Sequence, residues 1–98
     1  MSTDLHVVAV IEGKPGSAEA IKAVVQPCIE TTRKEEGCLK YDFHQDQARP
    51  DRFIFVEHWA SQDVLEKHSK APHLKALADG LANLTATPLE VSVLKKLF

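Results

Sequence analysis

The sequence predicts a single α+β domain over residues 1–98, in which helices cover one face of an antiparallel β-sheet. Segments with strand-like and helix-like patterns follow one another in the order strand, helix, strand, strand, helix, strand. Glycine and proline residues with turn chemistry separate most of these segments. The chain has 98 residues, of which 44% are apolar, and both values are ordinary for one globular domain.

The first strand and a long helix are predicted from the N-terminal third of the chain. Leu5–Glu12 is an apolar run rich in β-branched residues, which indicates a strand buried on both faces. Ser17 follows a glycine- and proline-containing turn and can cap a helix over residues 17–36. Pro27 lies inside this helical pattern, and because the apolar stripe keeps its phase we expect a kink rather than two helices. Gly37 is expected to end the helix.

The middle of the chain predicts two strands joined by a hairpin. Cys38–Gln45 alternates between apolar and polar residues, whereas Arg52–Trp59 carries apolar residues on both faces. The polar segment 46–51, which contains Pro50, is expected to form the hairpin loop.

The C-terminal third predicts two helices and a last strand. Ser61 can cap a helix that extends to about Ser69. Pro72 ends that helix and begins another, whose apolar stripe reaches Leu84. Residues 89–97 follow as a strand.

This order of elements is that of the ferredoxin-like split βαβ arrangement. Leu5–Glu12 and Arg52–Trp59 are apolar on both sides, so the sheet face away from the helices also needs cover. A second copy of the same sheet would supply that cover. We therefore expect a homodimer in which two sheets form a dimeric α/β barrel.

Charge and composition exclude several partners. The net charge is −2, from 12 basic and 14 acidic residues, and no basic stripe is present, which argues against nucleic acid. No apolar run approaches the roughly 18 residues of a membrane span. The N-terminal residues lack a basic start followed by an apolar segment. We therefore expect no signal peptide and a cytoplasmic protein in which Cys28 and Cys38 remain thiols.

One stretch of the sequence forms the candidate site. Trp59, the only tryptophan, ends a predicted strand, and His68 and His73 follow on the next helices. Glu57 shares a strand face with Trp59, and burial there raises the pKa of a carboxyl group and suits it to act as a base. Each residue also has a structural interpretation, as a packing residue or, for Glu57, as a salt-bridge partner.

The sequence predicts neither a flavin nor a metal. It contains no glycine-rich nucleotide-binding motif. The two histidines of the candidate site have no cysteine and no clustered carboxylates near them in the sequence, so a metal site is not expected.

Short sequence motifs are distributed along nearly the whole chain. They are Pro15-Gly16, Glu35-Glu36-Gly37-Cys38, Glu57-His58-Trp59-Ala60-Ser61, Leu65, His68, Pro72 and His73. Together they resemble the antibiotic biosynthesis monooxygenase family, small dimeric α+β-barrel proteins. The resemblance implies the fold but leaves several chemistries open. Many members oxygenate phenolic or quinol-like substrates with molecular oxygen and without flavin or metal. Some relatives degrade haem, others isomerise small phosphorylated carbonyl compounds, and some have no known activity.

With this resemblance we expect a pocket between the sheet and the helices of one protomer, for a small aromatic or carbonyl substrate. The catalytic candidates are His68 or Glu57 as a base and Trp59 as a wall for a planar ring. The candidate substrate-binding residues are Tyr41, Phe43, Phe55 and His73.

The expected activity is cofactor-independent monooxygenation of a small phenolic, quinol or polyketide-like substrate, with molecular oxygen as co-substrate. Isomerisation of a hydroxy-ketone, possible because it also starts with proton removal, is the first alternative. Haem degradation, with His68 or His73 as axial ligand, is the second. The third is a dimer that binds a small aromatic metabolite without catalysis.

Overall fold

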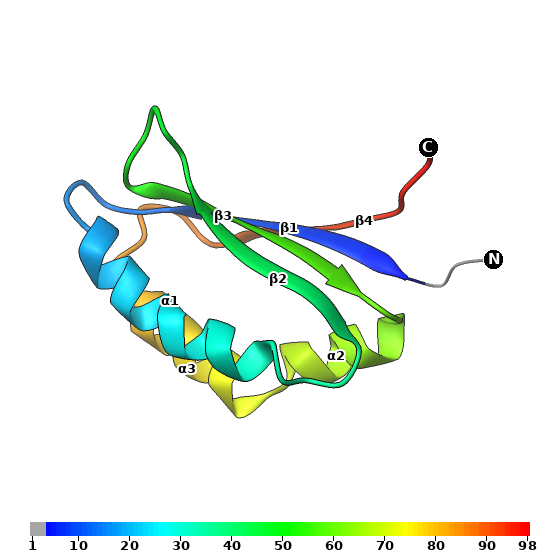
Figure 1. Cartoon of the computed structure of the whole chain (residues 1–98). Helices are drawn as coiled ribbons and strands as arrows, with labels where there is room; N and C mark the ends of the chain where they lie inside the picture. The colour runs from blue at the N-terminus through cyan, green and yellow to red at the C-terminus, as the bar shows by residue number, and fades with distance from the viewer. Residues whose placement is uncertain (1–3) are drawn as a thin grey trace.

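The computed structural model describes residues 4–98 as a four-stranded antiparallel sheet with helices on one face (Figure 1). The elements are β1 (Leu5–Glu12), α1 (Ala18–Thr32), β2 (Cys38–Gln45), β3 (Arg52–Trp59), α2 (Gln62–Ser69), α3 (Pro72–Leu81) and β4 (Glu90–Leu94). The sheet order β2-β3-β1-β4 is that of the ferredoxin-like arrangement, so the predicted fold class is confirmed. The expectation of no signal peptide rests partly on residues 1–3, which lie outside the described residues.

Alternation along the two central strands creates the core. β1 pairs with β3 from Leu5 opposite Trp59 to Glu12 opposite Arg52, and alternate residues of both strands are buried. The buried set faces the helices, because successive side chains of a strand point to opposite faces. The intervening residues of β1 and β3 are only partly buried. The sheet therefore has one covered face and one face that this chain alone does not cover.

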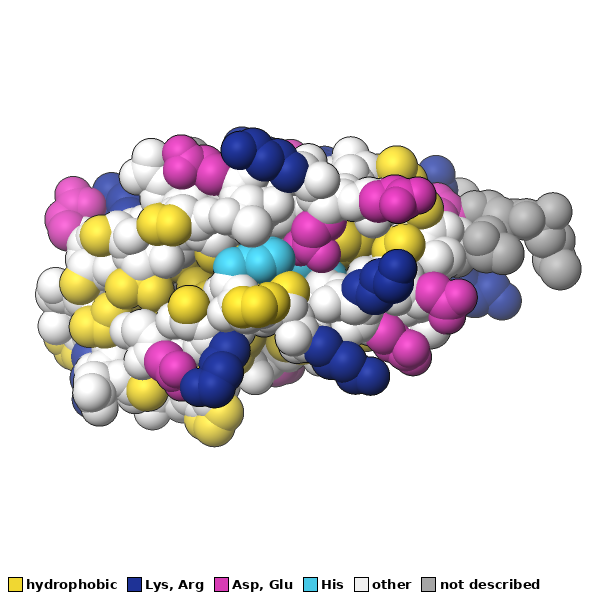
Figure 2. Space-filling view, turned by 90° about the horizontal axis from the view of Figure 1, so that it is seen from below, with side chains coloured by type: hydrophobic (Ala, Val, Ile, Leu, Met, Phe, Trp, Pro, Cys, Tyr) yellow, Lys and Arg dark blue, Asp and Glu magenta, His cyan; other side chains and the backbone are white. Residues whose placement is uncertain are grey.

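The helices form the second layer. In the view onto this layer, charged side chains surround a central area of apolar and histidine side chains (Figure 2). None of the helices in the described part of the chain is long and apolar enough to cross a membrane.

Two elements, the first helix and the last strand, are shorter than predicted. The first helix ends at Thr32 rather than near residue 36, because the next amides, those of Lys34 and Glu35, bond three residues back and tighten the chain into turns. Gly37, with φ of 83°, then directs the chain into β2 instead of capping the helix. The last strand covers only Glu90–Leu94, not residues 89–97. The helix does continue through Pro27, as expected.

The N-terminus of α1 is capped from the hairpin loop and not by Ser17. The carboxylate of Asp51 accepts hydrogen bonds from the amides of Gly16 at 3.1 Å and Ala18 at 3.0 Å. The Ser17 side chain makes no capping bond, and its buried hydroxyl has no partner among the described residues. Asp51 therefore ties the β2–β3 loop to the helix and places a negative charge at the positive end of the helix dipole.

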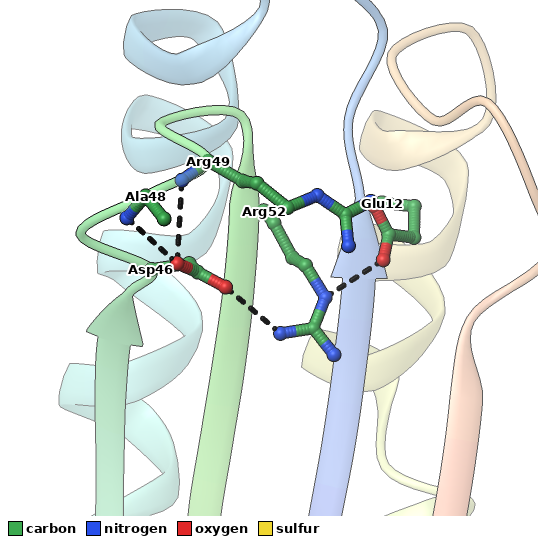
Figure 3. A network of polar contacts seen from close by, with 5 residues as sticks. All are labelled: Glu12, Asp46, Ala48, Arg49 and Arg52. Atoms are coloured by element: carbon green, nitrogen blue, oxygen red, sulfur yellow. Dashed lines mark hydrogen bonds and ion pairs between the residues drawn. The ribbon is translucent and has the colours of Figure 1, made fainter.

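Charged side chains fix the same hairpin to β1 (Figure 3). The guanidinium of Arg52 donates to Glu12 at 2.7 Å and to Asp46 at 3.0 Å, and Arg49 reaches the other oxygen of Glu12 at 2.7 Å. Asp46 also accepts from the amides of Ala48 and Arg49. Each exposed pair contributes little alone, so the network chiefly sets the hairpin geometry at the end of the sheet far from the candidate site.

The capping geometry predicts different costs for two substitutions. Asp51→Ala should lower the free energy of unfolding by about 1–2 kcal/mol, because two amides lose their acceptor. Ser17→Ala should change it by less than about 0.5 kcal/mol or stabilise, because it removes a buried hydroxyl without a partner. Urea unfolding followed by circular dichroism measures both, and equal losses would show that Asp51 is not the cap.

Candidate functional site

A cavity of about 580 Å³ lies between the inner face of the sheet and helices α2 and α3. All four strands contribute to its sheet side, and its walls are mostly apolar. Three buried titratable residues also line these walls, namely Tyr41, Glu57 and His68. Tyr41 pairs with Glu57 across β2 and β3, and its ring lies 5.3 Å from that of His68. The cavity thus has a small polar area in an apolar enclosure, as small-molecule sites commonly do.

Glu57 occupies a core position of β3. It is 5% exposed, and its Oε1 accepts a hydrogen bond of 2.9 Å from the indole N–H of Trp59. Burial raises the pKa of the Glu57 carboxyl to about 7, and the charge of Glu35 adds to this, whereas the Trp59 hydrogen bond opposes it. Near neutral pH Glu57 is therefore available both as a carboxylic acid and as a carboxylate.

His68 is held by α2 with its ring against the core. Ser61 caps this helix by accepting from the amide of Val64, as predicted, and sets the start of the helical phase. The His68 side chain is only 6% exposed, and its Nδ1 lies 2.7 Å from Oε2 of Glu35. Burial lowers its pKa, and the hydrogen bond to Glu35 acts in the opposite direction. Among the described residues Nε2 has no hydrogen-bond partner, and His68 is one of the residues that line the cavity.

Trp59 stands behind these groups and not on the cavity wall. It is fully buried, and its ring lies 4.4 Å from that of His68 at an angle of 40°. The expected stacking of Trp59 on a planar substrate does not fit this position. The indole instead contacts both titratable groups, Glu57 through its N–H and His68 through its ring.

The aromatic residues of the sheet divide into lining and packing groups. Tyr41 and Phe55 line the cavity, as expected. The Tyr41 hydroxyl lies toward α1, 4.0 Å from the sulfur of Cys28, so the ring rather than the hydroxyl meets the cavity. Burial raises the pKa of Tyr41 strongly, which keeps it protonated. Phe43 was expected to bind substrate, but it stacks on Phe53 and contacts Phe55 outside the lining.

Glu35 is the site residue that the sequence patterns missed. It lies in the turns after α1, and its Oε2 is 2.9 Å from Nε2 of His73 as well as 2.7 Å from Nδ1 of His68. His73, the second residue of α3, was expected in the pocket but contacts Glu35 outside the cavity lining. The sequence places no cluster of carboxylates near the two histidines, but the fold brings the carboxylate of Glu35 to both of them.

Within residues 4–98, two groups of side chains have the residue types that bind metal ions. Glu35, His68 and His73 form one, and Asp4, His6 and His58 form the other on the opposite face of the sheet. In the second group the two rings stack 4.3 Å apart, and Asp4 bonds to His58. In the first, two imidazole N–H groups donating to one carboxylate oxygen account for the contacts without an ion.

The turn that carries Glu35 depends on Gly37. A Cβ atom at this glycine would lie 2.7 Å from a methyl carbon of Val64, so the turn packs directly on α2. The carbonyl of Gly37 also accepts from the amide of Ala60, just before that helix. These contacts bring the C-terminal side of α1 against the helix that carries His68.

The sequence and the fold are similar to those of known proteins. Residues 4–80 match the antibiotic biosynthesis monooxygenase family, and the chain belongs to this family. It is 32% identical over 87 residues to the Escherichia coli protein named probable quinol monooxygenase YgiN, covering 79% of this chain and 84% of that protein. It is also 32% identical over 85 residues to sll1783 of Synechocystis, covering 87% of this chain but only 58% of that longer protein. The crystal structure of PA3566 from Pseudomonas aeruginosa superposes with a TM-score of 0.90 at 33% identity, covering 100% and 98% of the two chains.

The raised pKa of Glu57 predicts how stability depends on pH. The folded protein holds a proton that an unfolded carboxyl, with a pKa of about 4.5, releases. This contribution is full below about pH 4.5 and is lost as the pH rises through about 7. The free energy of unfolding of the wild type relative to Glu57→Gln should therefore fall by about 2–3 kcal/mol over this range. Urea unfolding of both proteins between pH 4.5 and 8 measures the difference. A difference independent of pH would show that Glu57 titrates normally.

Proposed function

We propose that this protein is a cofactor-independent monooxygenase that oxidises a small phenolic, quinol or polyketide-like compound with molecular oxygen. The observation that carries the proposal is the presence of His68 and Glu57 on one apolar cavity, with pKa values displaced in opposite directions. A non-catalytic binding pocket does not need such a pair, whereas proton transfer at neutral pH does. The family membership of the chain supports the same activity.

His68 is the base in this proposal. Its lowered pKa leaves the imidazole neutral near pH 7, and Nε2 is available to take a proton from a substrate hydroxyl. The resulting substrate anion is electron-rich and can transfer electrons to oxygen without a cofactor. Glu57, in its protonated form, can donate a hydrogen bond or a proton to the oxygen that becomes negative.

The overall reaction balances without an external reductant. In an anthrone-like substrate a CH₂ group gives up its two hydrogens and becomes a carbonyl group. In a quinol two hydrogens are likewise lost, and a ring C–H becomes the C–OH of a hydroxyquinone. One atom of O₂ enters the product, and the other leaves as water with the two hydrogens. The apolar walls hold the ring and exclude bulk water while the anion exists. Because the substrate supplies the electrons, the chemical step needs neither flavin nor metal.

Isomerisation of a hydroxy-ketone is the second candidate, because it uses the same base and acid. Lys70 lines the cavity and is exposed at the end of α2, where it could meet a phosphate or carboxylate group of such a substrate. Haem degradation stays an alternative for His68 but fits His73 less well, since the Nε2 of His73 bonds to Glu35. Visible absorbance of the purified protein distinguishes this case.

We also propose that the protein works as a homodimer in the cytoplasm. Apolar side chains of β4 and the C-terminus are exposed, namely Leu89, Val91, Val93, Leu94, Leu97 and Phe98. The outer faces of β1 and β3 add partly buried valine and isoleucine side chains. Leu94 pairs with His6 on this outer face, whereas Val91 and Val93 pair with Ala9 and Val7 on the helix side. A monomer would leave these apolar side chains in water, and a partner subunit would cover them. The two cysteines are free, in keeping with a reducing compartment.

Light scattering coupled to size-exclusion chromatography tests the dimer. The wild type should elute with twice the chain mass of 10.9 kDa at micromolar concentration. Leu94→Glu should shift it toward the monomer, because a charge then replaces an exposed apolar side chain of β4. Lys96→Glu, an exposed charge change close by, serves as the control. A stable wild-type monomer would refute the proposal.

Oxygen-isotope labelling tests the reaction. With anthrone or a naphthohydroquinone as probe under ¹⁸O₂, the product should gain one ¹⁸O atom, and metal chelators should not reduce turnover. Spontaneous oxidation of a quinol to its quinone leaves no label, so mass spectrometry separates the two processes. Enzyme-dependent oxidation without incorporation would exclude a monooxygenase.

The pH dependence of kcat/KM assigns the two roles. The rate should rise with pH as His68 loses its proton, at a pKa below 6.5, and fall as Glu57 loses its proton near pH 7. His68→Gln should lower kcat about 100-fold or more. Glu57→Gln should remove the decrease at high pH. If His68→Gln retains full turnover while Glu57→Gln abolishes it, Glu57 is the base.

A further inference from the structure

One carboxylate oxygen serves both histidines of the helical layer. Oε2 of Glu35 lies 2.7 Å from Nδ1 of His68 and 2.9 Å from Nε2 of His73, and the two rings are in edge contact 6.0 Å apart. The three residues come from the turns after α1, from α2 and from α3. Glu35 and His73 are each 19% exposed and do not line the cavity, whereas His68 does. Figure 2 shows histidine and acidic side chains next to each other in the middle of this face.

We propose that Glu35 is a positioning residue that fixes the tautomer of His68, and that His73 in turn holds Glu35 in place. This inference rests on the role of His68 as the base in the proposed function. A neutral imidazole carries its single proton on one nitrogen, and its other nitrogen is an acceptor. An ionised carboxylate only accepts, so Nδ1 of His68 must carry the proton. Nε2 then presents its lone pair to the cavity, which is the form that a base needs.

Glu35 also stabilises the product of proton transfer. When Nε2 takes a proton from the substrate, the imidazolium that forms already has an anion 2.7 Å from its other nitrogen. The titratable groups near His68 are Glu35, His73, Tyr41 and Glu57. Tyr41 remains neutral, and Glu57 carries part of a charge near pH 7 but belongs to the opposite wall. Glu35 is thus the group whose position decides which nitrogen of His68 is protonated.

His73 gives the carboxylate a fixed position. Its N–H is the second donor to Oε2, and it comes from the start of α3, whereas His68 comes from α2. A carboxylate held by donors from two helices cannot turn away from either without losing a hydrogen bond. If Glu35 only joined the helices, it would make the same contacts. Its replacement would then leave the tautomer of His68 and the pH profile unchanged, so these two properties are the ones to measure.

The first measurement does not depend on any substrate. Long-range ¹H–¹⁵N spectra of protein labelled at histidine nitrogen should show His68 protonated at Nδ1 and unprotonated at Nε2 at neutral pH. In Glu35→Gln the population of the other tautomer should rise clearly, because an amide can donate as well as accept. Glu36→Gln is the matched control, since it removes the same charge from the adjacent, exposed residue. It should leave the His68 signals unchanged.

Turnover of the naphthohydroquinone or anthrone probe is the second measurement. Glu35→Gln should lower kcat by about 10- to 100-fold with KM within about twofold, and it should move the low-pH limb of the profile to lower pH, because the imidazolium loses its anion. Glu36→Gln should retain wild-type values. If Glu35→Gln folds poorly, His73→Phe keeps the packing but removes the second donor. It should give a smaller loss, about 3- to 10-fold, with the same change of tautomer.

Two results decide against the inference. A wild-type tautomer and pH profile in Glu35→Gln would show that Glu35 is only structural. Equal effects of Glu35→Gln and Glu36→Gln would show a general charge effect and not positioning. If the wild type oxidises neither probe, the proposed function fails, and the spectra alone then decide whether Glu35 sets the tautomer.

Discussion

The buried indole of Trp59 is the contact on which the rest of the site depends. Its N–H holds the carboxyl group of Glu57, and its ring supports the imidazole of His68. Tyr41 packs edge-on against the same ring from β2. Because Trp59 is fully enclosed at the end of β3, these side chains have little freedom to rotate. The sheet thereby fixes Glu57 on one wall of the cavity, and α2 holds His68 on the facing wall.

A carboxyl group at the buried position of Glu57 lowers the stability of the core. An apolar side chain at this site of β3 would avoid the cost of burying a carboxyl group with one hydrogen bond. Burial shifts the equilibria of Glu57 and His68 in opposite directions, because it always disfavours the charged form. The same apolar enclosure thus yields a neutral imidazole and a protonatable carboxyl at one pH. A single physical cause, burial, therefore shifts both pKa values toward the neutral forms of the two groups.

The fold was predictable from local patterns because strands and helices leave different periodicities. β1, β2 and β3 have the predicted bounds, since apolar alternation and the flanking turns determine them. The errors concern the ends of elements, which depend on contacts between residues distant in sequence. Asp51, from the hairpin, caps α1 in place of the adjacent Ser17. The end of α1 depends on the packing of Gly37 against Val64, which helical periodicity does not contain. Strand β4 is shorter than predicted because its pairing with β1 runs only from Leu94 opposite His6 to Glu90 opposite Val10.

In the candidate site, too, local sequence patterns predict some residues, whereas others depend on contacts between distant parts of the chain. His68 and Glu57 were predictable, since each shares a face with apolar neighbours in its own element. The position of Trp59 behind them was not predictable. Alternation along a strand shows on which face of the sheet a residue lies, but not whether it lines a cavity or is buried beneath the lining. Glu35 lies in a charged run, Arg33 to Glu36, that is typical of a solvated helix end. Only the turn at Gly37 brings its carboxylate to two imidazoles from other helices. The periodicity of the sequence does not indicate a contact such as that of Glu35 with two histidines. The contact is visible only in the structure, where the turn after α1 meets α2 and α3.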